Sequence, residues 1–413
     1  MVPILSLVCV LGTWLAAGMA ALEVAESIQG AAAARAAATK QSSRALQTNQ
    51  RLSHMRQAPV LMVVGVQKGG TSFLGAVFTK LFCGPVAGEP HFWSDMCLAV
   101  ASAGPSTRDR YLESHFNASS SRCRPGELQL IFEKSPASYT KPWVPARLVE
   151  AFRAPSIMPK IVMLLRNPTA RAWSGFLQCA HYLSANLFGH TTSILGNSTF
   201  AHQLFASLAR LEMDVVENCS VPVGSGNFIV DYANARDFGA CCEAVAVHHG
   251  QHKWPGCRAY GRSYTKNYTT SDLYRCTKAS SQLGLRPSDG KVRWSGGAFG
   301  DYCFDFVRQG IYVNYLPAWF SSGLDVNLIL SEELFSNPNG VAKRILKLTQ
   351  SVPVDAIEYR LNRTLNLETT RNAKAVGLFA RMPETTEREL NEFYRTYNQK
   401  LASIYLHRDP EWH

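Results

Sequence analysis

Apolar residues gather in several short runs along the chain, and each run ends abruptly at glycine, proline or charged residues. The first run, Val60–Val66, is rich in β-branched residues, which predicts a buried strand. It is followed by Gln67 to Ser72, after which apolar residues recur at helical spacing through Phe73, Val77 and Leu81. This pattern predicts a strand, a glycine-rich turn and the start of a helix.

Similar patterns recur further along the chain. We predict three more strands, at 128–133, 160–165 and 326–331, and helices at 168–182, 312–320, 340–349 and 384–405. Strands that alternate with helices indicate an α/β fold, with a parallel sheet flanked by helices. Ligands of such sheets bind at the carboxyl ends of the strands. The polar residues that follow the predicted strands all fall at this edge.

The turn after the first strand has the composition of a phosphate cradle. Gly69 and Gly70 let the backbone approach an anion closely, and the following helix directs free N–H groups at the same point. Lys68 adds a charge, and Thr71 and Ser72 add hydroxyl donors. In a Walker A loop the lysine directly precedes the Ser/Thr, whereas here it precedes the glycine pair. The alternative is an ordinary glycine-rich turn.

A second anion site is predicted after the strand at 160–165. Arg166 ends that strand and Pro168 suits the first turn of a helix. Ser174 lies eight residues beyond Arg166, so it can face back toward the strand end. Arginine offers a planar fork of donors to phosphate oxygens, and serine offers one more. The two predicted sites together favour binding of a nucleotide with separate 5′ and 3′ phosphate groups. The alternative for the second site is a surface arginine beside a helix start.

The N-terminal residues point to a membrane or a secretory route. Residues 2–22 carry no charged side chain and are long enough to cross a bilayer, so they predict a signal anchor or a cleaved signal peptide. No Lys or Arg precedes the segment, whereas Arg35, Lys40 and Arg44 follow it, so the flanking charges give no support to a lumenal C-terminus. Residues 23–58 are rich in Ala, Gln and Arg, which is typical of a stem between a membrane and a domain. We therefore predict the globular domain at 59–413.

Cysteines and glycosylation sequons favour the secretory lumen. Ten of the eleven cysteines follow the apolar segment, and sequons occur at Asn117, Asn197, Asn218, Asn267 and Asn362. Seven of those cysteines lie between Cys179 and Cys303, which predicts a cysteine-rich insertion at 179–303 held by disulfides. The alternative is a zinc site, which would use Cys241, Cys242, His248, His249, His252 and Cys257; their spacing matches no common zinc pattern.

The net charge of +11 indicates an anionic partner or simple solubility, and charge alone does not decide between them.

Five segments resemble the sulfotransferases that use 3′-phosphoadenosine-5′-phosphosulfate (PAPS), above all the Golgi carbohydrate branch. GVQKGGTS resembles that family's 5′-phosphosulfate loop, LLRNPTARAWSGF its 3′-phosphate motif, and EKSPASY its E-K-[ST]-P-A-[YF] segment. The tail from Met382 resembles N-acetylgalactosamine 4-sulfate 6-O-sulfotransferases. GEPHFW resembles the E-x-H-F-F segment of heparan sulfate sulfotransferases, although Ser94 stands before Asp95 here.

The resemblance implies roles for individual residues. Glu89 would be the catalytic base, and Lys68 would neutralise the bridging oxygen of the donor. Lys134 and His91 would stabilise the sulfuryl oxygens or orient Glu89. The donor-binding residues would be Lys68, Gly69, Gly70, Thr71, Ser72, Arg166 and Ser174, with Lys374 in place of the family's K-G-R element, which is absent here. Alternatively, Glu89 is a loop carboxylate, His91 a packed histidine and Lys134 a solvent-facing lysine.

The expected activity is transfer of a sulfuryl group from PAPS to a carbohydrate hydroxyl, without a metal and without nucleic acid as a partner. The expected acceptor is a polyanionic glycan, and the expected location is the Golgi membrane in type II orientation, or secretion if 1–22 is removed. Two other functions stay open at this point: a P-loop nucleotide kinase, and an inactive membrane protein that binds glycans.

Overall fold

The computed structural model describes residues 29, 33–43, 60–82, 89–94, 104–116, 130–153, 157–187, 198–219, 235–249, 305–349, 361–365 and 381–412. The chain divides into two units, Met1–His54 and Met55–His413. In the first unit, residues 33–43 form a helix with exposed side chains. Among the described residues, no helix has both the length and the apolar character needed to cross a bilayer. The predicted anchor at 2–22 lies outside them.

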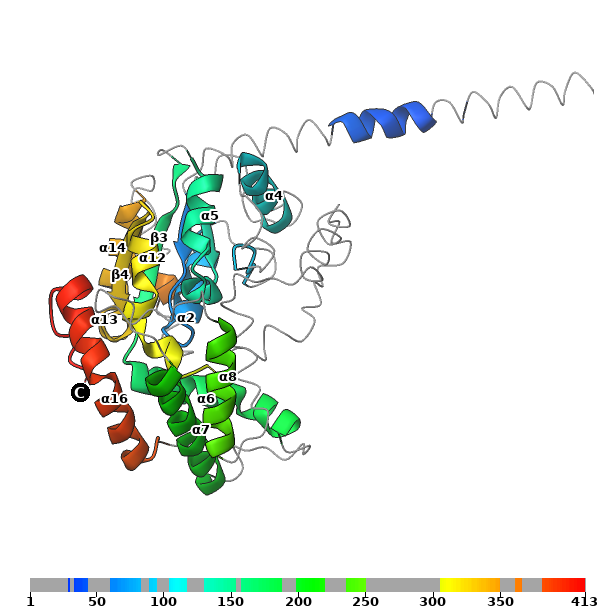
Figure 1. Cartoon of the computed structure of the whole chain (residues 1–413). Helices are drawn as coiled ribbons and strands as arrows, with labels where there is room; N and C mark the ends of the chain where they lie inside the picture. The colour runs from blue at the N-terminus through cyan, green and yellow to red at the C-terminus, as the bar shows by residue number, and fades with distance from the viewer. Residues whose placement is uncertain are drawn as a thin grey trace, which may run out of the picture. The chain divides into compact units, whose positions relative to one another are not determined.

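A four-stranded parallel sheet organises the second unit (Figure 1). Its strands are β1 (Val60–Val63), β2 (Ile131–Lys134), β3 (Lys160–Leu165) and β4 (Asp325–Leu330), in the spatial order β2-β1-β3-β4. Val63 pairs with Lys134, and Leu165 pairs with Leu330. The register therefore places the carboxyl ends of all four strands along one edge, and the predicted α/β fold with a parallel sheet is confirmed.

Helices surround this sheet and extend beyond it. They are α2 (Thr71–Leu81), α4 (Pro105–His115), α5 (Val144–Ala151), α6 (Pro168–Leu187), α7 (Ser198–Cys219), α8 (Ala235–His248), α12 (Leu316–Phe320), α13 (Ser331–Ser336), α14 (Pro338–Leu348) and α16 (Glu384–Leu401). Short 3₁₀ turns occupy η1 (Pro136–Thr140), η5 (Arg308–Gly310) and η6 (Tyr312–Asn314), and a π-helical turn, η7 (Ala402–Leu406), follows α16.

Alternate residues of the strands enter two separate cores, as the two-residue period of a strand requires. Val60 and Met62 of β1 pack with residues of α4, α5 and α12. Leu61 and Val63 pack with residues of α2 and α14 on the other face. Both faces are apolar because helices cover both, which is typical of parallel sheets.

Several predicted boundaries differ from the structure: the first two strands are Val60–Val63 and Ile131–Lys134, and the helices predicted at 168–182 and 340–349 are Pro168–Leu187 and Pro338–Leu348. The strand predicted to reach Ser331 ends at Leu330, and Ser331 begins α13. The helix predicted over 312–320 starts as the turn η6 and becomes α-helical only at Leu316, next to Pro317, because proline suits the first turn of a helix. The last predicted helix ends at Leu401 and continues as η7.

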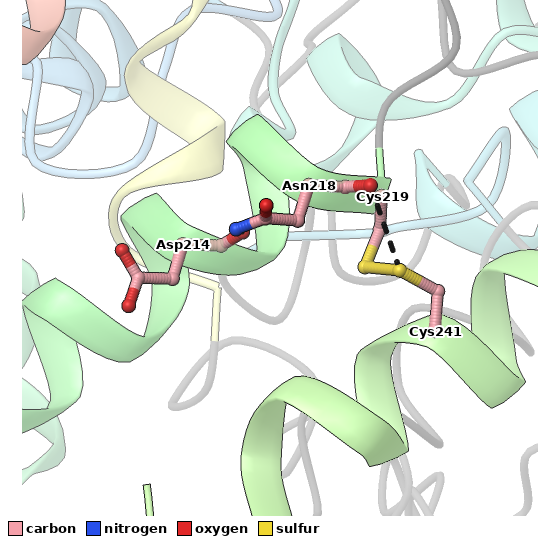
Figure 2. The surroundings of a disulfide bond; sticks show 4 residues. All are labelled: Asp214, Asn218, Cys219 and Cys241. Atoms are coloured by element: carbon pink, nitrogen blue, oxygen red, sulfur yellow. Dashed lines mark hydrogen bonds between the residues drawn. A yellow bond between two sulfur atoms is a disulfide. The ribbon is translucent and has the colours of Figure 1, made fainter. Parts of the chain in front are cut away.

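A third core lies at the predicted cysteine-rich insertion. It joins α6, α7, α8, η5 and α16, which gather below the sheet in the view of Figure 1. Figure 2 shows Cys219, at the end of α7, bonded to Cys241 of α8. Cys179 and Cys242 are disulfide-bonded as well. The disulfide interpretation is therefore confirmed for these four cysteines.

The alternative zinc site is wrong for Cys241 and Cys242, because sulfurs engaged in disulfides are not thiolate ligands. His249 instead lies with Nε2 2.5 Å from Asp214 Oδ2 of α7. The described residues contain no group of three or more His, Cys, Asp or Glu side chains able to hold a metal ion. His252 and Cys257 lie outside the described residues.

Because Gly65 has no side chain, the first loop can lie close to β3. A Cβ at Gly65 would lie 2.4 Å from the Leu164 backbone nitrogen, a contact that only a backbone shift can relieve. We expect Gly65→Ala to lower the free energy of unfolding by about 3 kcal/mol or more, through overpacking against backbone. Urea unfolding measures this. Gly104→Ala is the control because a Cβ there meets nothing within 4 Å; an equal loss in both variants would contradict the assignment.

Candidate active site

The first loop has the strand–turn–helix geometry that its sequence predicts. Gly70 has a φ of 93° and precedes α2, and Lys68 also has a positive φ, of 69°. The Gly69 amide donates to the Val66 carbonyl at 2.9 Å, so in this conformation it is already used inside the turn. Thr71 is buried and Ser72 exposed at the start of α2. Their amides have no intrahelical acceptor, as expected in the first turn of a helix.

The second loop lies directly against the first. Arg166 Nη1 donates to the Lys68 carbonyl oxygen at 2.9 Å. Tyr312 donates its hydroxyl to the Arg166 carbonyl at 2.5 Å, and the Asn167 side chain accepts from the Ala170 amide at 3.1 Å at the start of α6. The predicted proximity of Lys68 and Arg166 is therefore confirmed.

Both cations are held in surroundings that disfavour their charge. Burial and the charge of Arg166 lower the pKa of Lys68. Burial likewise lowers the pKa of Arg166, while the charge of Glu332 acts in the opposite direction. Two partly desolvated cations at one place are stabilised when an anion binds between them. The electrostatics of this edge therefore favour a negatively charged ligand.

A carboxylate with a lysine and a histidine as partners lies at the carboxyl end of β2, the strand beside β1. Glu89 Oε1 lies 2.7 Å from Lys134 Nζ, and Glu89 Oε2 lies 3.0 Å from His91 Nε2. Burial would raise the pKa of Glu89, but hydrogen bonds and charges of His91 and Lys134 outweigh it, and the pKa lies below its ordinary value. These three residues were predicted to meet at the sheet edge, and the structure brings them together.

Neighbouring elements hold this group in place. Lys134 ends β2 beside β1, and its side chain runs along α2 at Gly75, where a Cβ would lie 2.8 Å from Lys134 Cδ. His91 has a φ of 51°, and its amide donates to Ser135 Oγ at 3.2 Å. The positions of Lys134 and His91 are thus set by backbone and packing as well as by their contact with Glu89.

Beneath the group lies a buried pair that sequence reasoning missed. Tyr111 of α4 donates its hydroxyl to Glu133 Oε2 of β2, and both side chains are fully buried. Burial raises the pKa of both groups, so the neutral forms are favoured. Glu133 precedes Lys134 in the EKSP segment, and this adjacency was the only sequence signal; nothing in α4 distinguishes Tyr111.

The structure says less about two of the predicted donor-binding residues, Ser174 and Lys374. Ser174 lies half-buried on α6, seven residues after the capping Asn167, and its contact with a phosphate stays a prediction. Lys374 lies outside the described residues, so its predicted role also stays a prediction.

Comparison with known proteins adds little to this geometry. No protein-family model matches the chain, and no curated protein matches it. Among solved structures, a sulfotransferase from Alicyclobacillus acidocaldarius is similar with a TM-score of 0.43 and 17% sequence identity, over 86% of this chain and 98% of that one. A likeness at this level carries no argument about activity, so the function has to be argued from the site itself.

Proposed function

We propose that the protein is a PAPS-dependent O-sulfotransferase that acts on a carbohydrate hydroxyl. The observation that carries the proposal is the contact between the two anion loops: Arg166 Nη1 lies 2.9 Å from the Lys68 carbonyl. One adenosine nucleotide with phosphates at both its 5′ and 3′ positions suits two cationic loops this close. The Glu89 carboxylate, held by Lys134 and His91 at the end of β2, would add the base that sulfuryl transfer needs.

The residues present fit the donor. Lys68, the first turn of α2 and the hydroxyls of Thr71 and Ser72 would hold the 5′-phosphosulfate. Arg166 and Ser174 would hold the 3′-phosphate. When bound, PAPS supplies a sulfuryl group on its 5′-phosphate. Burial lowers the pKa of both Lys68 and Arg166, and a bound anion would favour the charged form of each.

Glu89 would be the base. It accepts the proton of the acceptor hydroxyl as that oxygen bonds to sulfur and the bond from sulfur to the 5′-phosphate oxygen breaks. Lys68 neutralises the charge that develops on the departing phosphate oxygen, and Lys134 and His91 keep Glu89 ionised and aligned. The products are a sulfate ester and adenosine 3′,5′-bisphosphate.

The acceptor and the compartment belong to the same proposal. A net charge of +11 suits a polyanionic glycan, and the E-P-H-F-W segment resembles glycan-acting sulfotransferases. Disulfides at four described cysteines suit an oxidising lumen. We therefore place the protein in the Golgi, as a membrane-anchored or a secreted enzyme.

The test is transfer of radiolabel from PAPS to a panel of glycans by the full-length protein, with EDTA present. We expect labelled glycan, with the highest rate on one acceptor class and no loss in EDTA. Transfer from ATP that EDTA abolishes would favour a nucleotide kinase instead. Glycan binding without any transfer from PAPS would favour the inactive binding protein, and either result would overturn the proposal.

A further inference from the structure

The short helix α13, directly after β4, contacts both anion loops. The hydroxyl of Ser331 lies 2.5 Å from the Gly69 carbonyl oxygen and 2.8 Å from the Leu165 carbonyl oxygen. Gly69 belongs to the first loop, and Leu165 immediately precedes Arg166 of the second. Because Ser331 is fully buried, its single hydrogen is shared between two carbonyl groups away from water.

A second side chain of α13 reaches the second loop. Glu332 Oε1 accepts a hydrogen bond from the Asn167 amide at 2.9 Å. The charge of Glu332 also acts on Arg166, the residue before Asn167. Leu334 and Phe335 lie against the first loop, since a Cβ at Gly70 would be 3.1 Å from Leu334 Cδ2 and 3.2 Å from Phe335 Cζ. The helix therefore contacts the first loop through Ser331, Leu334 and Phe335, and the second through Ser331 and Glu332.

The helix is itself anchored away from the loops. Glu333 binds Arg344 of α14 through both carboxylate oxygens, at 2.6 and 3.1 Å, and lies 3.4 Å from Arg408. Leu334 is buried in the core that α2 and α14 share with the sheet. A helix fixed at its back and bonded to both loops at its front holds those loops at one separation.

We infer that Ser331 and Glu332 are positioning residues that set the distance between the two anion pockets, and so select a nucleotide phosphorylated at both ends over one phosphorylated at one end. This inference rests on the proposed function, because it takes the donor to span both loops. The physical basis is preorganisation: once one phosphate is bound, the second meets its pocket at a high effective concentration only if the separation matches.

A purely electrostatic role for Glu332 predicts the opposite result. A carboxylate close to an anion pocket repels the ligand, so its removal would strengthen binding. If Glu332 acts by holding the Asn167 amide, its removal weakens binding of the two-ended nucleotide. The sign of the change therefore separates the two roles.

Calorimetric titration with adenosine 3′,5′-bisphosphate and with adenosine 5′-monophosphate tests the inference. For the wild-type protein we expect the second phosphate to tighten binding by about a hundredfold or more. In Ser331→Ala and Glu332→Ala we expect this gain to shrink by about tenfold, while binding of the monophosphate changes by less than about threefold. Glu332→Gln keeps an oxygen that accepts from Asn167 and should retain most of the gain.

Ser336→Ala is the matched control, because the Ser336 hydroxyl bonds only to the Glu333 carbonyl of its own helix, at 3.3 Å, in the contacts described. It should behave as wild type. Glu332 is exposed, so Glu332→Ala tests the inference even if Ser331→Ala fails to fold. Equal weakening of both nucleotides, or tighter binding in Glu332→Ala, overturns the inference alone. A wild-type protein that binds both nucleotides equally overturns the proposed two-ended donor as well.

Discussion

Replacing Glu89 by glutamine is expected to lower kcat by at least about a hundredfold, because an amide cannot accept the proton of the acceptor hydroxyl. Glutamine keeps the size of the side chain and one oxygen for Lys134 or His91, which lie 2.7 and 3.0 Å from the carboxylate. The arrangement should therefore survive while the basic group is lost. Initial rates of label transfer from PAPS to the best acceptor measure the change.

Binding of the nucleotide product separates loss of chemistry from loss of structure. Glu89 contacts Lys134 and His91 rather than the two anion loops, so Glu89→Gln should bind adenosine 3′,5′-bisphosphate within about twofold of wild type. Glu150→Gln makes the same chemical change in an ion pair with Arg147 on α5 and should leave kcat unchanged. Activity of Glu89→Gln close to wild type would rule out Glu89 as the base.

The pH dependence of kcat/KM offers a further check on the same residue. The base acts as the carboxylate, and although burial raises its pKa, hydrogen bonds from His91 and Lys134 and the charge of Lys134 hold the pKa of Glu89 below its usual value. Activity should therefore persist as the pH falls to the ordinary pKa of a glutamate, about 4.3, and decline only below it. A decline that begins near pH 6 would indicate a different base.

Much of this site follows from one regularity of the sequence. Each predicted strand ends at a polar residue, and parallel strands bring such ends to one edge. That rule alone brought Lys68, Lys134 and Arg166 to the same edge before any contact was known. Glu89 and His91 follow no regular strand, and only the resemblance of GEPHFW to a family segment indicated them.

The residues that sequence reasoning missed act through contacts distant in the chain. Ser331 bonds Gly69 across more than two hundred residues, and the hydrophobic pattern counted it only as the end of a strand. Tyr111 meets Glu133 because α4 packs on the sheet, and no local spacing predicts that packing. Local pattern predicts where a strand ends, whereas the partner of a buried polar group depends on how the elements pack.

The described part of the insertion shows a similar limit. No helix was predicted in it beyond residue 182, yet Ser198–Cys219 and Ala235–His248 are helices. Phe205 and Val215 of α7 are fully buried against neighbouring helices. Tertiary packing of an apolar face stabilises these helices, and the average composition of the segment does not reveal such a face.

Replacing Lys68 by alanine is the other substitution expected to have a large effect, again lowering kcat by at least about a hundredfold. The lysine lies in the turn before α2, where burial and the charge of Arg166, which donates to the Lys68 backbone carbonyl, both lower its pKa. A charge in such surroundings interacts more strongly with a developing anion than a charge in water does. Its loss should therefore affect the transition state more than the bound substrate, so that kcat falls further than 1/KM.

Two further variants make this test specific to the position of the charge. Lys80→Ala removes a lysine from the far end of α2, about 14 Å along the helix from Thr71, and should keep kcat within about twofold of wild type. Lys68→Arg keeps the charge but replaces a compact ammonium group by a planar fork, so we expect intermediate activity. If Lys68→Ala instead raised KM alone and left kcat intact, Lys68 would bind the donor without stabilising the departing phosphate. Lys134, whose ammonium group lies 2.7 Å from Glu89, would then be the candidate for neutralising the departing phosphate oxygen.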